Sequence, residues 1–162
     1  MEKSTLLVIS KLIASIVICQ LAGVIGSLFT TPAIPTWYAT LRKPSFNPPN
    51  WIFSPVWITL FVLMGIAAFL VWNKGLSDQK VKIALSIFAV QLILNVLWSV
   101  MFFGLRSPLA GLFDIVVLWM AILLTILYFF RVSSAAGILL IPYILWVSFA
   151  AVLNFSIWRL NI

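Results

Sequence analysis

The sequence predicts an all-α integral membrane protein, a bundle of five transmembrane helices with one long ordered loop between the first two helices. Of its 162 residues, 64% are hydrophobic and 8% are charged, and the mean hydropathy is +1.22. A water-soluble domain of this length carries far more charge. The chain also contains five apolar runs, each near the roughly 20 residues that a helix needs to cross about 30 Å of hydrocarbon. We therefore expect one multi-pass membrane domain spanning residues 1–162.

The five expected helices cover residues 6–29, 52–73, 81–105, 108–131 and 135–158. Gly75 follows the second run and suits a left-handed helix cap, and Ser107-Pro108 places a cap before a proline at the first helical position. Pro142 leaves a helical carbonyl unpaired and is expected to bend the fifth helix. The first run has the charged start of a signal peptide. It lacks an Ala-x-Ala-like cleavage site and is long for such a segment, so we interpret it as the first helix.

Charge and cysteine content exclude several classes of function. Ten Lys and Arg residues stand against three acids, for a formal charge of +7, but they are scattered singly between apolar runs. This pattern indicates membrane topology and lipid headgroups, and no nucleic acid partner is expected. The chain has no His and a single cysteine, Cys19. We therefore predict no metal site, no bound cofactor and no catalysis by a carboxylate pair.

The basic residues also bear on orientation. The end of the expected bundle that holds the N-terminus has six: Lys3, Lys11, Lys74, Lys80, Lys82 and Arg131. The opposite end has four: Arg42, Lys43, Arg106 and Arg159. Six against four favours a cytoplasmic N-terminus, with the long loop on the outer side.

The connection between the first two helices, residues 30–51, is the unusual part of the chain. Together with the start of the second helix it carries the stretch Trp37 to Trp57, which is rich in aromatic residues and prolines. A connection of this length is usually functional or disordered, and its aromatic content argues against disorder. We expect it to fold back onto the bundle as a lid.

Two polar stripes are predicted inside the membrane. The first follows the third helix and contains Gln91, Asn95, Trp98 and Phe102; the second follows the fifth helix and contains Pro142, Trp146, Ala150 and Asn154. Polar groups at this depth are costly unless they meet a partner or a cavity, which makes them candidates for a site. Alternatively, Gln91 and Asn95 join helices by hydrogen bonds, and the two roles are compatible. Asp114 is expected to be a structural partner for an interfacial group.

Three spaced blocks of residues resemble one known family. The first block is Trp37-Tyr38, Leu41, Lys43-Pro44-Ser45, Pro48-Pro49, Trp51 and Trp57; the second is Asn95-x-x-Trp98, Phe102-Phe103-Gly104, Arg106 and Asp114; the third is Pro142-Tyr143-x-x-Trp146, Ala150 and Leu153-Asn154. On these blocks the chain is similar, over nearly its whole length, to bacterial members of the TspO/MBR family, the translocator or peripheral-type benzodiazepine receptor proteins.

This resemblance implies a five-helix bundle, commonly a homodimer, with a pocket at the end of the bundle that carries the first loop. The pocket of the family takes porphyrins such as protoporphyrin IX and aromatic drug-like ligands. Carried over by position, its lining is Tyr38, Pro48, Trp57, Asn95, Trp98, Trp146 and Ala150. Members are also reported to degrade protoporphyrin IX in light, which would make Trp57 and Trp146 the catalytic residues.

The chain departs from the family pattern at two places. The mammalian cholesterol motif needs a tyrosine near the C-terminus, where this chain has Phe155-Ser156, and this argues against high-affinity sterol binding. Phe46 replaces a tryptophan that is often found in the loop.

Two functions follow as hypotheses. One is a tetrapyrrole-binding membrane protein that serves transport or stress regulation. The other is an enzyme for light-dependent oxidative degradation of protoporphyrin IX. Because conventional acid–base groups are absent, such an enzyme would use the photoreactivity of the porphyrin and electrons from tryptophan. A small four-helix drug exporter is disfavoured because the chain lacks a membrane-embedded glutamate.

Overall fold

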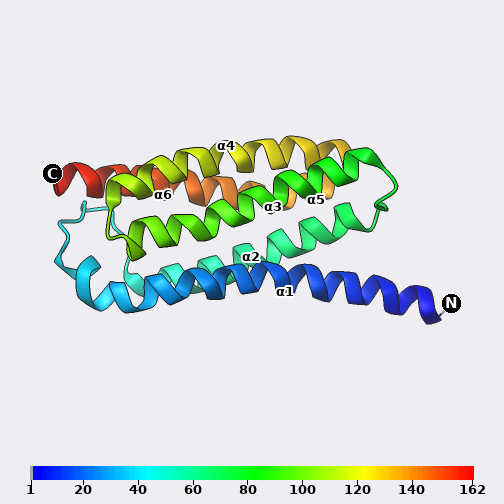
Figure 1. Cartoon of the computed structure of the whole chain (residues 1–162), viewed down its shortest axis with the longest axis horizontal. Coiled ribbons are helices and arrows are strands. Elements are labelled where there is room, and N and C mark those ends of the chain that lie inside the picture. The colour runs from blue at the N-terminus through cyan, green and yellow to red at the C-terminus, as the bar shows by residue number, and fades with distance from the viewer. Residues whose placement is uncertain (1) are drawn as a thin grey trace.

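The computed structural model describes the backbone of residues 2–162 and the side chains from Thr5 onward. Figure 1 shows long helices lying side by side, with the N-terminus and the C-terminus at opposite ends of the bundle. In chain order the elements are α1 (Glu2–Ala33), the π-helix η1 (Ile34–Tyr38), α2 (Asn50–Trp72), α3 (Gln79–Ser99), the π-helix η2 (Val100–Gly104), α4 (Pro108–Val132), α5 (Ser134–Leu139) and α6 (Ile141–Leu160).

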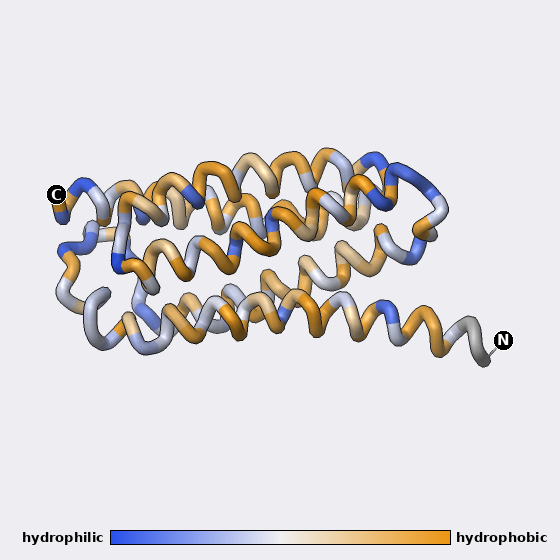
Figure 2. Tube along the Cα trace, in the orientation of Figure 1, coloured by the Kyte–Doolittle hydropathy of each residue, from blue (hydrophilic) through white to orange (hydrophobic). Residues whose placement is uncertain are grey.

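Five helical spans of the described chain are long and apolar enough to cross a membrane, which confirms the predicted fold class. Hydrophobic residues run along the whole length of these helices, and hydrophilic residues gather mainly in the turns at the two ends (Figure 2). The third predicted helix is α3 continued by η2, and the fifth is α5 followed by α6. The chain is thus an integral multi-pass membrane protein.

The predicted loop over residues 30–51 is too long. The first helix continues through Ala33 and then through η1, and only residues 41–49 are irregular. Pro32 and Pro35 lack an N–H, but the helix widens into a π-turn and the hydroxyl of Thr36 donates to the carbonyl of Pro32 at 2.8 Å. Such local adjustments let transmembrane helices tolerate proline. Two prolines this close together would ordinarily end a helix.

The other predicted boundary signals are observed. Gly75 has a φ of +105°, as its left-handed cap requires, and Ser107 accepts a hydrogen bond from the N–H of Ala110. The fifth helical span breaks at Leu140, and Pro142 lies in the first turn of α6, where no N–H is needed. The span is thus interrupted next to Pro142, where the sequence predicts a bend.

The helices pack unevenly around the core. The backbone of α4 lies close to α3, α5 and α6, whereas the backbone of α2 lies close to α1 and α5 and farther from α6. Met64, Val71, Val81 and Ile122 are fully buried in the main core. Because the backbones of α2 and α6 stay apart, the bundle has room between them for large side chains and a cavity.

Candidate ligand pocket

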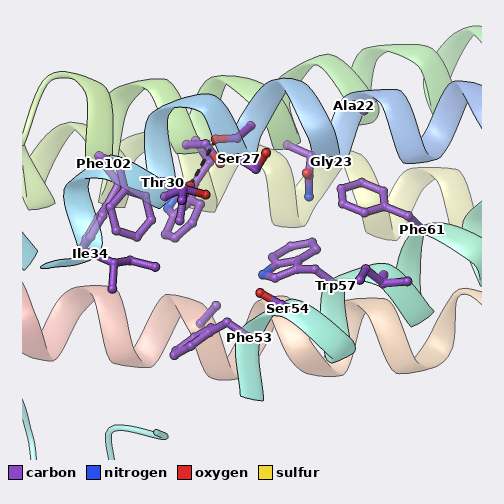
Figure 3. Close-up of a pocket in the computed structure, with 18 of the residues that line it drawn as sticks. Ala22, Gly23, Ser27, Thr30, Ile34, Phe53, Ser54, Trp57, Phe61 and Phe102 are labelled. Atoms are coloured by element: carbon purple, nitrogen blue, oxygen red, sulfur yellow. Dashed lines mark hydrogen bonds between the residues drawn. The ribbon is translucent and has the colours of Figure 1, made fainter. Parts of the chain in front are cut away.

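A cavity of about 360 Å³ lies at the end of the bundle that carries residues 41–49. Its walls come from α1, η1, α2, α3, η2 and α6, and they are mainly apolar. Cavities of about 300–1,000 Å³ with a few placed polar groups are typical of small-molecule sites. Figure 3 shows Trp57 of α2 projecting toward α1, on the side where Gly23 and Ser27 lie.

The structure brings six of the seven expected ligand-binding residues to this one cavity. They are Tyr38, Trp57, Asn95, Trp98, Trp146 and Ala150. Pro48, the seventh, does not line it. Residues 41–49 do not line the cavity. They lie on the far side of Tyr38, which does line it.

Several lining residues were missed by the sequence interpretation, and most of them belong to α1 and α2. They include Gln20, Gly23, Ser27, Thr30, Ser54 and Phe61. Gln20 was the available signal, since it is a polar side chain in the middle of an apolar run. Its amide nitrogen donates to the carbonyl of Ile58 at 3.0 Å, which joins α1 to α2 at the inner end of the cavity.

Aromatic side chains form much of the wall. Trp98 and Phe102 are stacked, with ring centroids 5.2 Å apart and an interplanar angle of 22°. Trp146 meets Phe53 edge to face at 6.0 Å. Aromatic pairs of this geometry stabilise by about 0.5–1.5 kcal/mol beyond the burial of their area. Since Trp57, Trp98 and Trp146 come from three helices, the cavity offers indole surface on several sides.

The two π-helices shape the cavity at its outer end. η1 supplies Ile34 and Tyr38 to the wall, and η2 supplies Phe102 and Phe103. Tyr38 packs against both phenylalanines, at centroid distances of 6.3 and 5.7 Å. A π-turn rotates the following residues relative to a regular helix, and such turns are frequent at functional sites.

Side-chain hydrogen bonds join residues 41–49 to the bundle at two points. The hydroxyl of Tyr38 donates to Oδ1 of Asn47 at 2.9 Å. At the other point, Asn161 beyond α6 accepts from the N–H of Arg42 and donates to its carbonyl, both at 2.9 Å. The Nζ of Lys43 lies 4.6 Å from the centre of the Tyr38 ring. The segment therefore braces the outer wall of the cavity from behind.

One side of the cavity reaches the outer surface of the bundle. The lining residues that are exposed are Val24, Ser27 and Thr31 on α1 and Asn50, Ser54 and Ile58 on α2. The opening therefore lies between α1 and α2.

Asn95 and Gln91 do join helices, as the alternative interpretation held. Nδ2 of Asn95 donates to the hydroxyl of Tyr143 at 3.0 Å, and that hydroxyl donates to Oε1 of Gln91 at 2.9 Å. Gln91 does not line the cavity, whereas Asn95 does. Asn95 thus combines an interhelical bond with a place in the wall.

Two enclosed polar atoms of the described chain have no hydrogen-bond partner, Oδ2 of Asp114 and Nε1 of Trp146. The expectation that Asp114 pairs with an interfacial group is wrong, because α4 buries it among the helices. An unpaired buried polar group costs about 1–3 kcal/mol. The Nε1–H of Trp146 is one such unpaired group, and Trp146 lines the cavity.

Comparison with known proteins agrees with this architecture. The profile of the TspO/MBR family matches residues 15–159. Tryptophan-rich protein TspO of Chlorobaculum tepidum is 51% identical over 144 residues, which cover 89% of this chain and 91% of that protein. The protein of the same name from Archaeoglobus fulgidus is 48% identical over 154 residues, covering 94% and 98%. The human translocator protein is 38% identical over 138 residues, covering 85% and 82%.

The family match covers nearly all of the five helical spans, and the relatives align over most of their own length. The chain belongs to the TspO/MBR family.

Proposed function

We propose that this protein binds tetrapyrroles such as protoporphyrin IX in the cavity between α1, α2, α3 and α6. The observation that carries the proposal is the convergence of Trp57, Trp98 and Trp146 on one apolar cavity at the end of the bundle. A porphyrin is flat and largely apolar, so it stacks well on indole and phenyl faces.

Basic residues at the same end suit the propionates of a porphyrin. Arg42 is exposed, and Lys43 lies behind the ring of Tyr38, which lines the cavity. Hydrogen bonds between ionised partners are roughly twice as strong as neutral ones. We therefore place the propionates toward residues 41–49 and the macrocycle among the tryptophans.

A titration of the purified protein with protoporphyrin IX, followed by quenching of tryptophan fluorescence, tests this function. Ala150→Phe should weaken binding at least about tenfold, because the added ring fills the cavity that Ala150 lines. Val152→Phe is the matched control, since Val152 is exposed on the same helix and does not line the cavity. Equal affinity of wild type and Ala150→Phe would refute the proposed site.

The alternative function is light-dependent oxidative degradation of protoporphyrin IX. It is favoured by one observation, that Trp57 and Trp146 line the same cavity and so would both contact a bound porphyrin. Light would excite the porphyrin, dioxygen would be the oxidant, and an indole would supply an electron or trap a radical.

Illumination of the protein with protoporphyrin, in air and under argon, separates the two functions. Loss of a new absorbing product in Trp57→Phe and Trp146→Phe, with binding retained, favours the enzyme. Identical bleaching in all variants, or in detergent alone, favours the binding protein. A role of the protein in transport or stress regulation stays a prediction. The same holds for its assembly as a homodimer.

A further inference from the structure

Four side chains from three helices form a hydrogen-bonded chain beside the cavity. Nε2 of Gln91 faces the sulfur of Met64 at 4.0 Å, and Oε1 of Gln91 accepts from the hydroxyl of Tyr143 at 2.9 Å. The oxygen of Tyr143 in turn accepts from Nδ2 of Asn95 at 3.0 Å. The chain thus runs from α2 through α3 and α6 to the wall of the cavity.

The polarity of this chain is set at its closed end. A thioether sulfur can only accept, and both Met64 and Gln91 are almost completely buried. If Gln91 were turned over, its oxygen would face the sulfur with no donor between them, and its buried NH₂ would lose that partner. Gln91 therefore presents its oxygen to Tyr143, and the hydroxyl of Tyr143 must donate in that direction.

The open end of the chain is then an acceptor. Since the Tyr143 proton is given to Gln91, Asn95 must turn its NH₂ toward the tyrosine oxygen, which leaves Oδ1 of Asn95 without a hydrogen bond from any described residue. This oxygen is not one of the two enclosed polar atoms that lack a partner. Because Asn95 lines the cavity and this oxygen is not enclosed, we infer that Oδ1 faces the open space there.

We propose that Gln91, which lies outside the cavity wall, sets Asn95 as a hydrogen-bond acceptor, so that the pocket prefers flat aromatic ligands that carry an N–H or O–H donor. This inference rests on the proposed function, the binding of a flat aromatic guest in the cavity. Gln91 is a positioning residue that acts through Tyr143. It determines the class of ligand without touching it.

A substitution at Gln91 should change the ligand preference, although Gln91 does not line the cavity. In Gln91→Leu, which leaves no polar atom at this position, the hydroxyl of Tyr143 loses its acceptor, and the next acceptor within its reach is Oδ1 of Asn95. The Asn95 amide then turns over and presents its NH₂ to the cavity. Preference for donor ligands should disappear although no lining residue has changed. Thr125→Val is the matched control, because Thr125 is equally buried, bonds only the carbonyl of Ala121 and lies outside the cavity wall.

Three probes of the same shape measure the preference. Carbazole carries an N–H donor, dibenzofuran has an oxygen at that position, and fluorene has a methylene group. Each is titrated calorimetrically into the protein in lipid nanodiscs, with empty nanodiscs as the partition control. Wild type and Thr125→Val should bind carbazole about two- to tenfold more tightly than fluorene, the range of one neutral hydrogen bond. Gln91→Leu should bind carbazole no more tightly than fluorene and should gain relative affinity for dibenzofuran.

Equal binding of carbazole and fluorene by the wild type would overturn the inference, and this comparison needs no variant to fold. An unchanged carbazole preference in folded Gln91→Leu would overturn it as well. Titration of protoporphyrin IX into the same samples keeps the two proposals apart. Discrimination among the small probes without protoporphyrin binding would refute the proposed tetrapyrrole function alone, and protoporphyrin binding without discrimination would refute the inference alone.

Discussion

The close contact between α1 and α2 depends on Gly65 of α2, which packs against the backbone of Ile16 of α1. A Cβ atom built on Gly65 would lie 2.6 Å from the Cα of Ile16 and 3.0 Å from its backbone nitrogen. Ordinary contacts begin at 3.4 Å, so Gly65→Ala requires the two helices to separate by about 0.8 Å at this point. The obstacle is backbone, which no change of rotamer can relieve.

Overpacking of this kind typically costs about 1–3 kcal/mol. Gly65→Ala should therefore lower the free energy of unfolding by that amount, measured by SDS titration in mixed micelles with circular dichroism. Since the cavity opens between the same two helices, the affinity for protoporphyrin IX should fall as well. The result would show that close packing of α1 and α2 maintains the cavity wall.

Gly104→Ala is the matched control. Its added Cβ would lie 3.0 Å from a ring atom of Phe29, a side chain that can shift, and Gly104 is exposed. We expect a change below about 1 kcal/mol for this variant. The reasoning is refuted if Gly65→Ala unfolds at the same SDS concentration as wild type, or if both variants lose the same stability.

Three further predictions concern the same end of the bundle. Asn161→Ala removes both hydrogen bonds to the backbone of Arg42 and should speed trypsin cleavage after Arg42 severalfold; an unchanged cleavage rate would show that these bonds do not hold the segment. Pro48→Ala/Pro49→Ala should weaken protoporphyrin binding more than it lowers the free energy of unfolding, because these prolines stiffen residues 41–49, which brace the cavity wall from behind. Unchanged affinity in a fluorescence titration would contradict this bracing role. Arg106 has a φ of 52°, in the left-handed region that favours glycine. Arg106→Gly should therefore keep or raise the thermal unfolding temperature, and Arg106→Val should lower it by a few degrees. The opposite order in a melting experiment would exclude backbone strain at this residue.

The helices were predictable because their signal is local. An apolar run of about 20 residues between polar turns is visible along the chain, and helix formation in a bilayer follows from the need to satisfy every backbone group. The same holds for Gly75 and Pro142, whose effects on the backbone are confined to one turn. The largest boundary error is the end of the first helix near Pro32, where a π-turn and the hydroxyl of Thr36 removed the usual cost of proline.

The candidate site was predictable in part. The stripes through Asn95 and Trp98 and through Trp146 and Ala150 follow from helical periodicity, and the structure places all four in one cavity. The contribution of α1 was missed because Gly23 and Ser27 look like ordinary residues of a transmembrane helix. Their role depends on which face of α1 turns toward α2 and α3, and periodicity in one helix cannot specify its neighbour.

By itself, the amino-acid sequence determined that this chain crosses the membrane five times and carries aromatic and amide side chains on two inner helix faces, because hydropathy and period belong to a single segment. Tertiary structure alone decided that Pro48 stays behind the wall, that Asn161 holds Arg42 across 119 residues of sequence, and that Gln91 orients Asn95 through Tyr143. These relations join segments far apart in the chain. They exist only when packing has brought the segments together, so no local pattern encodes them.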